Sequence, residues 1–319
     1  MKVTKSDFAH VKSYMYRHAR PIEIARWKVH FENGSKEDFM DVLQHYQNED
    51  GGIGNALEAD SWNPHSTPYT TSYAIRLLNE INFTDKSHPM IMRILSYLEN
   101  TPHYTDGYWS ALIPTNNDYP HAPWWQYESQ DQVKEWGYNP TARLAGFIIA
   151  FADEGSKLYK EARTIAGKAI DQYLYGVTSD GTAYKDYSKE GEVRCYLYLI
   201  QCLENANIAN QYNTEELKPI LQQQVQKFIE RDTSKWAEYC QKPSHFIDSP
   251  DSVVYVGNED IMDKELDYII NKRNKDGVWD IVWRWNAYPD AFEVSKNWWK
   301  SCIIIENMLL LKKFGRLDG

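Results

Sequence analysis

The sequence predicts an all-α protein of five to six helix pairs. Apolar residues recur at positions i, i+3, i+4 and i+7 in one segment after another, which is the pattern of amphipathic helices. Several of these segments run into similar turns that contain glycine, which indicates a repeated unit. A β-like run occurs only at 252–256, so a sheet with alternating strands and helices is excluded.

The first helix of each pair is expected to end at a turn. Helical stripes at 39–46, 91–98, 157–175 and 266–270 lead to glycine turns at 50–52, 106–109, 180–181 and 276–279. A further helix that ends near Phe228 leads to the glycine-free turn Ser234-Lys235-Trp236. Glycine suits these positions because it adopts positive φ angles without strain.

The second helix of each pair is expected to follow the turn. Stripes of this kind cover 74–81, 144–151 and 196–203, and the first should begin at Pro68 with Ser66 or Thr67 as its cap. The segment 302–311 is apolar on nearly every side, which predicts an inner helix surrounded by neighbours. The side chains that we expect to be buried are Leu144, Phe147, Ile148 and Ile303 to Ile305.

The unequal spacing of the turns indicates how the helix pairs are arranged in space. Solenoids have more uniform repeats than these, so the sequence favours a closed (α/α) toroid in a single domain over 1–319. Two irregular segments rich in proline interrupt the pattern, at 101–139 and 240–258. Long segments of this kind are usually functional or disordered, and the many Trp and Tyr residues of the first argue against disorder there.

The composition of the chain indicates which binding partners and which cellular compartment to expect. The chain has 319 residues with 45 acidic and 35 basic side chains, a net charge of −10, which does not favour nucleic acid or anionic lipid. It begins without an apolar leader, has no CxxC pair and has no apolar stretch of membrane-spanning length, so we expect a cytoplasmic protein without a transmembrane segment. Aromatic residues make up 14% of a hydrophilic chain, so some of them are expected to line a cavity.

The turns resemble the QW-type repeat of the terpenoid cyclase and protein prenyltransferase superfamily, in which Gln-x3-Gly-x-aromatic ends an outer helix. The matching residues are Gln47, Gly51 and Ile53 in the first turn, with an aliphatic residue in the aromatic position, and Gly107, Trp109, Gly277 and Trp279 in two later turns. Residues 50–60 are also similar to the opening of small bacterial proteins of this superfamily. The resemblance covers most of the chain as architecture and implies a toroid with a central, aromatic-lined cavity.

The acidic motifs of that superfamily are missing. Asp-x-Asp-Asp and Asp-x-Cys do not occur, and the nearest approximations to Asp-Asp-x-x-Asp, at 37–41 and 259–263, lie at expected helix starts, where acidic residues are favoured anyway. Cys240 and His245 are isolated candidates for zinc ligands and are interpreted as a buried thiol and a surface imidazole. We therefore expect no metal and no cofactor.

The segment 51–73 is the first candidate site. Glu58, Asp60 and His65 lie between the glycine turn and a helix start, and paired carboxylates beside a histidine can perform acid–base catalysis when their pKa values differ. These three are the candidate catalytic residues, and Trp62 and Tyr69 are candidates for substrate binding. The alternative is a solvated loop in which the glycines only turn the chain.

Further candidates for substrate contact come from the aromatic loops and from the helix starts. Adjacent tryptophans expose a large apolar area unless they cover a cavity, stack on a sugar or pack beneath their loop. The aromatic-loop candidates are Trp124, Trp125, Tyr127, Glu128 and Tyr138, with Trp283 and Trp285 after the last glycine turn. Arg143, Arg194 and Lys296 stand at inner-helix starts, where cations and free N–H groups favour an anionic ligand. The alternative is a network of ion pairs with Glu128, Glu192 or Glu293.

Three functions fit these residues. The resemblance favours an enzyme that acts on an isoprenoid-like substrate by carboxylate acid–base chemistry, with aromatic faces that stabilise cationic intermediates. A carbohydrate-active hydrolase or lyase on an (α/α) toroid is the first alternative, since loop carboxylates can form an acid–base pair. A non-catalytic binding or scaffold protein is the second. A small-molecule substrate is expected in the first two cases, and the sequence leaves the oligomeric state open.

Overall fold

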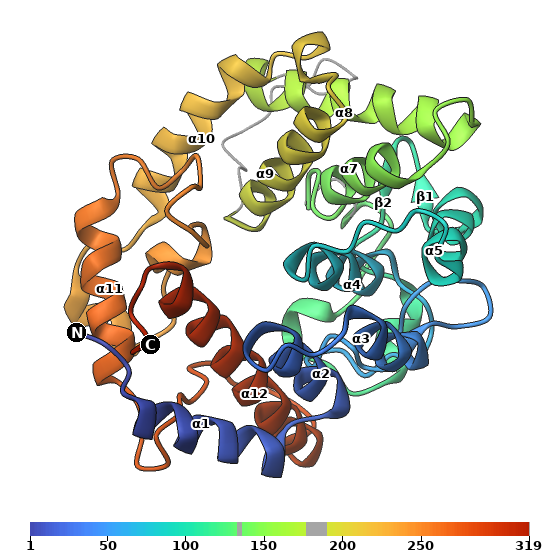
Figure 1. Cartoon of the computed structure of the whole chain (residues 1–319). Helices are drawn as coiled ribbons and strands as arrows, with labels where there is room; N and C mark the ends of the chain where they lie inside the picture. The colour runs from blue at the N-terminus through green and yellow to red at the C-terminus, as the bar shows by residue number, and fades with distance from the viewer. Residues whose placement is uncertain (133–135, 177–189, 319) are drawn as a thin grey trace. The chain divides into compact units, whose positions relative to one another are not determined.

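The computed structural model describes residues 1–132, 136–176 and 190–318 (Figure 1). The described chain is mostly helical, with one two-stranded antiparallel sheet, so the all-α prediction is confirmed. The chain divides into two compact units, one formed by 1–43 with 222–319 and the other by 44–221. Among the described helices, none is both long enough and apolar enough to cross a membrane.

The unit 44–221 is centred on helix α7 (Thr141–Phe151), which packs against α4, α5, α8 and α9. The bounds of its other elements are η1 (Gln44–Tyr46), α4 (Pro68–Glu80), α5 (Pro89–Asn100), β1 (Tyr104–Thr105), β2 (Tyr108–Trp109), η2 (Pro114–Asp118), η3 (Pro123–Trp125), α8 (Lys157–Tyr175), α9 (Glu190–Asn205) and η4 (Ala209–Gln211). Leu144, Phe147 and Ile148 of α7 are fully buried, as predicted. Helix α10 (Thr214–Phe228) spans the boundary between the two units.

The other unit joins both ends of the chain. Its elements are α1 (Lys5–His18), α2 (Pro21–Phe31), α3 (Lys36–Leu43), η5 (Thr233–Ala237), η6 (Pro243–His245), α11 (Glu259–Asn271) and α12 (Pro289–Lys313). Helix α12 packs against α1 and α2, and Val3 pairs with Leu317 in a parallel bridge. Ile304 and Ile305 of α12 are fully buried, whereas Ile303 is half-buried, because even this apolar helix keeps one side turned from the core.

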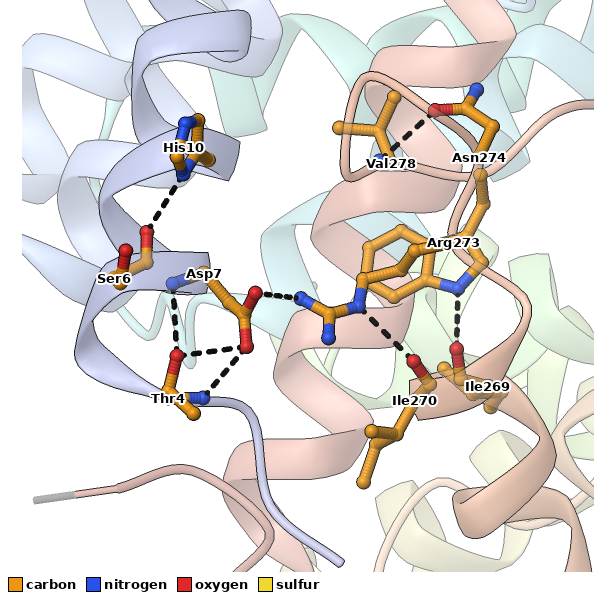
Figure 2. Close-up of polar contacts among 10 residues, drawn as sticks. Thr4, Ser6, Asp7, His10, Ile269, Ile270, Arg273, Asn274 and Val278 are labelled. Atoms are coloured by element: carbon orange, nitrogen blue, oxygen red, sulfur yellow. Dashed lines mark hydrogen bonds and ion pairs between the residues drawn. The ribbon is translucent and has the colours of Figure 1, made fainter.

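Helix α1 is tied at its start to the end of α11, as Figure 2 shows. The Thr4 side chain accepts a hydrogen bond from the Asp7 backbone, and the Asp7 carboxylate accepts one from the Thr4 backbone, which forms a capping box. Arg273 lies 2.8 Å from the other Asp7 oxygen. Asp7 therefore both completes the cap of α1 and pairs with Arg273, which follows the end of α11.

Three of the predicted glycine turns contain a glycine with a positive φ angle. Gly51, Gly107 and Gly277 have φ angles of 91°, 89° and 75°, in the region that favours glycine. The indole N–H of Trp109 donates to the Leu98 carbonyl at 3.1 Å, and that of Trp279 donates to the Ile269 carbonyl at 2.8 Å. In the two turns that carry a tryptophan, its indole N–H thus satisfies a carbonyl that the preceding helix leaves unpaired.

Most predicted helices are found where the sequence placed them, and two features differ. The segment 252–256 forms turns and no strand, and the hairpin at 104–109 was not predicted, because two residues per strand are too few to show alternation. The predicted turn at 180–181 lies outside the described residues. Closure of the helix pairs into a toroid, and their union in a single domain, stay predictions.

Candidate functional site

The loop between the first glycine turn and α4 is held by close backbone contacts. A Cβ atom on Gly54 would lie 2.4 Å from the carbonyl oxygen of His65, so only glycine allows the two ends of this loop to approach. The Thr67 side chain caps α4 by accepting from the Thr70 backbone at 2.9 Å, one of the two caps that the sequence allows. The Ile53 backbone N–H donates to Thr71 at 3.1 Å and fastens the loop to α4.

This loop lies beside the loop that carries the paired tryptophans. The Trp62 N–H donates to the Pro120 carbonyl at 3.0 Å, and the Ala122 N–H donates to the Asp60 carbonyl at 2.8 Å. Ser61 and His121 form an antiparallel bridge between them. The structure therefore brings the two loop candidates of the sequence together within the unit 44–221.

The candidate carboxylates are buried. Glu58 is 4% exposed and Asp60 is 2% exposed, so the alternative of a solvated loop is wrong for both residues. The Asp60 backbone N–H donates to Glu58 Oε2 at 3.0 Å. His65 is exposed, and its Nε2 lies 3.4 Å from the Tyr119 hydroxyl. The three candidate catalytic residues thus have different environments.

Tyr69, in the first turn of α4, is the centre of an aromatic group. Its ring centroid lies 4.3 Å from that of Trp125 and 6.0 Å from that of Trp136, and the two indoles stack on each other at 5.7 Å. Burial and, after it, the negative charge of Glu58 raise the pKa of Tyr69 to about 12, so the phenol is protonated at neutral pH. The indole N–H of Trp125 is buried without a hydrogen-bond partner among the described residues.

Arg143 adds a cation to this group. It is half-buried in the first turn of α7, and its Nη1 donates to the Ser72 hydroxyl at a long 3.4 Å. Within the part of the chain that the structure describes, it forms no ion pair with a carboxylate. We call Glu58, Tyr69, Trp125, Trp136 and Arg143 the Tyr69 cluster.

Tyr138 and Arg194 belong to the neighbouring helix start. The Tyr138 ring stacks 4.8 Å from Tyr108, and its backbone N–H donates to the fully buried Glu192 at 2.6 Å. Burial raises the pKa of Tyr138 well above its usual range. Arg194 is half-buried in α9. Sequence reasoning treated Glu192 only as a partner for cations, although an acid in the first turn of an apolar helix was a visible signal.

The adjacent tryptophans face different environments. Trp124 is 41% exposed, whereas Trp125 is 4% exposed and packs beneath the loop. The backbone of Tyr127 is held by Asn117, whose side chain both accepts from its N–H and donates to its carbonyl at 2.8 Å. Glu128 is exposed. Of this stretch, only Trp125 therefore enters the Tyr69 cluster.

Three of the predicted substrate contacts, Trp283, Trp285 and Lys296, belong to the other unit. The ring centroid of Trp283 lies 5.3 Å from that of Trp299, and the ring centroid of Trp285 lies 5.8 Å from that of Phe292. Lys296 forms an ion pair with Glu293 at 3.1 Å, so the ion-pair alternative is confirmed for this lysine.

A cavity of about 530 Å³ opens beside the first glycine turn, on the side where α5 packs. Its wall includes Asp50, His65, Ser66, Tyr97 and His103. The sequence marked His65 as a catalytic candidate and Ser66 only as a possible helix cap, whereas Asp50, Tyr97 and His103 come from segments that are distant from each other in the chain. We call this space the turn cavity.

The described residues contain no group of three or more His, Cys, Asp or Glu side chains arranged to hold a metal ion. His245 bonds to Gln241 at 2.8 Å through Nδ1, and Cys240 is half-buried with a free thiol. No known family model matches the chain, and no curated protein or solved structure is similar enough to count as a match.

Proposed function

We propose that this chain is an enzyme that binds an isoprenoid-like substrate with an anionic head group at the Tyr69 cluster. In this proposal, Arg143 holds the anion, the aromatic rings contact the apolar part, and Glu58 acts as general acid or base. The superfamily resemblance of the glycine turns supports the same substrate class.

The observation that carries the proposal is the environment of Arg143. Removing a guanidinium group from water is costly unless an anion compensates it. Arg143 is half-buried at a helix start, where backbone N–H groups also favour an anion, yet among the described residues its guanidinium donates only one long hydrogen bond, to Ser72. A substrate phosphate or carboxylate would supply the missing partner with bidentate geometry.

The remaining residues of the cluster match the other parts of such a substrate. Tyr69, whose phenol is close enough to Arg143 to be affected by its charge, and Trp136 are both partly exposed. Aromatic faces bind apolar chains and stabilise developing positive charge. Glu58 is buried close enough to Tyr69 for its charge to affect the phenol, which supports a role for its carboxylate in proton transfer beside the aromatic rings. Asp-rich motifs are not needed if an arginine binds the anion directly.

Ligand binding tests the anion site. Prenyl diphosphates, inorganic pyrophosphate and neutral oligosaccharides are titrated into the full chain by calorimetry and by thermal shift. We expect binding of a prenyl diphosphate to weaken at least tenfold in Arg143→Ala. Arg163→Ala is the matched control, since this half-buried arginine of the same unit already bonds to the Tyr212 hydroxyl at 2.9 Å.

Glu58→Gln tests the chemistry separately from binding. With a bound prenyl diphosphate, the amide should reduce product formation about 10²- to 10⁴-fold while the dissociation constant changes little. Equal binding in Arg143→Ala and in the unmodified chain would overturn the anion site. Binding of neutral oligosaccharides alone at the Tyr69 cluster would favour the carbohydrate-active alternative, and binding of none of these compounds would favour the scaffold alternative.

A further inference from the structure

We infer that Asn116 is a positioning residue for the Tyr69 cluster, because its side chain fixes the backbone of Trp125 and thereby the aromatic rings that a ligand would contact. Asn116 lies in η2, outside the cluster, and acts on a ligand only through Trp125. This role deepens the proposed function and rests on it, since a positioning residue matters only if the cluster binds a ligand.

Two buried asparagines connect the loop of Glu58 to Trp125. Asn63 and Asn116 are 3% and 2% exposed. The Asn63 side-chain oxygen accepts from the His65 backbone N–H at 3.0 Å, and its nitrogen donates to Asn116 Oδ1 at 2.9 Å. The Asn116 nitrogen in turn donates to the Trp125 carbonyl at 3.2 Å. Because the first oxygen accepts from a backbone N–H, the direction of each later bond is fixed, and the two amides form one connected chain.

The position of the Trp125 indole depends on its backbone. The indole N–H is buried and has no hydrogen-bond partner among the described residues, so no hydrogen bond of the side chain fixes the ring. The Trp125 carbonyl stands at the end of η3, where a short helix provides no partner, and the Asn116 amide satisfies it. Loss of this amide would leave a buried carbonyl without its donor, which costs more than an ordinary hydrogen bond contributes.

Trp125 affects a ligand through the rings that it packs against, since it is only 4% exposed itself. These rings belong to Tyr69 and Trp136, whose centroids lie 4.3 Å and 5.7 Å from that of Trp125, and both residues are partly exposed. A shift of the Trp125 backbone would remove support from both rings at once. Rings that are fixed before binding lose less conformational freedom when the apolar part of a substrate binds.

The adjacent asparagine provides a matched control. Asn117 holds the backbone of Tyr127 by two hydrogen bonds of 2.8 Å, one donated to its carbonyl and one accepted from its N–H. Asn117 is exposed, and Tyr127 lies outside the Tyr69 cluster. Asn116→Ala and Asn117→Ala therefore remove the same kind of backbone contact from neighbouring positions, and only the first should affect the cluster.

The first measurement compares two ligands that share a head group. A prenyl diphosphate and inorganic pyrophosphate are titrated by calorimetry into the full chain and into both variants. We expect Asn116→Ala to weaken prenyl diphosphate binding about fivefold and to leave pyrophosphate binding unchanged, because the rings contact only the apolar part. Asn117→Ala should match the unmodified chain with both ligands. Equal weakening of both ligands in Asn116→Ala would indicate a general loss of structure and would overturn the positioning role.

A double-variant cycle tests whether Asn116 acts through Trp125. In Trp125→Ala the indole is absent, so adding Asn116→Ala should weaken prenyl diphosphate binding no further. Asn63→Ala keeps both residues and removes only the bond that supports the Asn116 amide, so it should weaken binding in the same direction and by less. Circular dichroism selects a temperature at which every variant is folded. Additive losses in the double variant would show that Asn116 acts by another route.

Fluorine NMR follows the indole without a ligand. In the chain labelled with 5-fluorotryptophan, the Trp125 resonance is identified by its absence from Trp125→Phe. We expect Asn116→Ala to shift and broaden this resonance, and Asn117→Ala to leave it in place. An unchanged Trp125 resonance in Asn116→Ala would contradict the positioning role even if binding weakened.

Failure of this role and failure of the proposed function give different results. No binding of the prenyl diphosphate to the unmodified chain would refute the proposed function, and the positioning role with it. Normal binding that Asn116→Ala leaves unchanged would refute the positioning role alone.

Discussion

The ring centroid of Tyr69 lies 4.3 Å from that of Trp125, and this contact joins the first turn of α4 to a loop more than fifty residues later in the chain. The contact places a protonated phenol, two stacked indoles and a half-buried guanidinium in one group. It also distinguishes two adjacent tryptophans that are chemically identical.

We expect the two tryptophans to differ sharply in their contribution to stability. Trp125→Ala removes a buried indole from a packed aromatic group and should lower the free energy of unfolding by about 3–5 kcal/mol. Trp124→Ala removes an indole that is 41% exposed and should change it by about 0.5 kcal/mol or less. Urea denaturation measures the free energy of unfolding of both variants. Similar losses of stability in the two would contradict the burial of Trp125 and the exposure of Trp124.

Stability at acidic pH should depend on Asp7. Hydrogen bonding to Arg273 lowers the pKa of Asp7 from 3.8 to about 2 in the folded chain. A lowered folded pKa stabilises the protein above the unfolded value, and this contribution disappears as the pH falls from about 4 to 2. Because the pair is partly exposed and screened, we expect Asp7→Asn to cost about 1 kcal/mol at pH 7.

The difference between Asp7→Asn and the unmodified chain should shrink to near zero at pH 2. Denaturant unfolding at several pH values checks this slope. Combining Asp7→Asn with Arg273→Gln tests the assigned partner, since the double variant should lose less than the sum of the two single losses. A constant difference at every pH would refute the ion-pair explanation.

Two ion pairs with the same i, i+3 spacing should respond differently to loss of the acid. Glu23 is 1% exposed, and its two oxygens accept from Arg20 at 2.6 and 3.0 Å. Glu23→Gln removes the carboxylate that faces the buried Arg20 guanidinium and should cost about 3–5 kcal/mol. Glu293→Gln, in the exposed pair with Lys296, should cost less than about 1 kcal/mol. Equal losses of stability in the two variants, measured by thermal unfolding, would mean that burial does not determine how much the Arg20–Glu23 pair contributes to stability.

Thiol labelling should distinguish Cys240 from the other cysteines. Cys195, Cys202 and Cys302 are buried, and burial raises the pKa of Cys202 and of Cys302 to about 12, which leaves little reactive thiolate. Cys240 is half-buried. We expect a thiol reagent to modify one cysteine in the folded chain and all four in denaturant, as read by mass spectrometry. Rapid modification of a second thiol in the folded chain would contradict this burial, and Cys240→Ser identifies the reactive group.

Local features of this protein could be predicted from the sequence. Helix 157–175 has the predicted bounds, and α4 begins at Pro68 behind the Thr67 cap. Apolar spacing, caps and glycine turns depend on interactions within a few residues, so they are visible in a linear pattern. The same reasoning identified Glu58, Tyr69, Trp125 and Arg143 as candidates, because unusual residue types stood in a loop or at a helix start.

The tertiary structure decided which of these candidates meet and in what surroundings. It buried Glu58, separated Trp124 from Trp125, paired Lys296 with Glu293 and left Arg143 with one long hydrogen bond. It also formed the turn cavity from Asp50, Tyr97 and His103, none of which the sequence marked as a site. Burial and hydrogen-bond partners depend on which distant segments pack together, and residue types alone do not specify that packing.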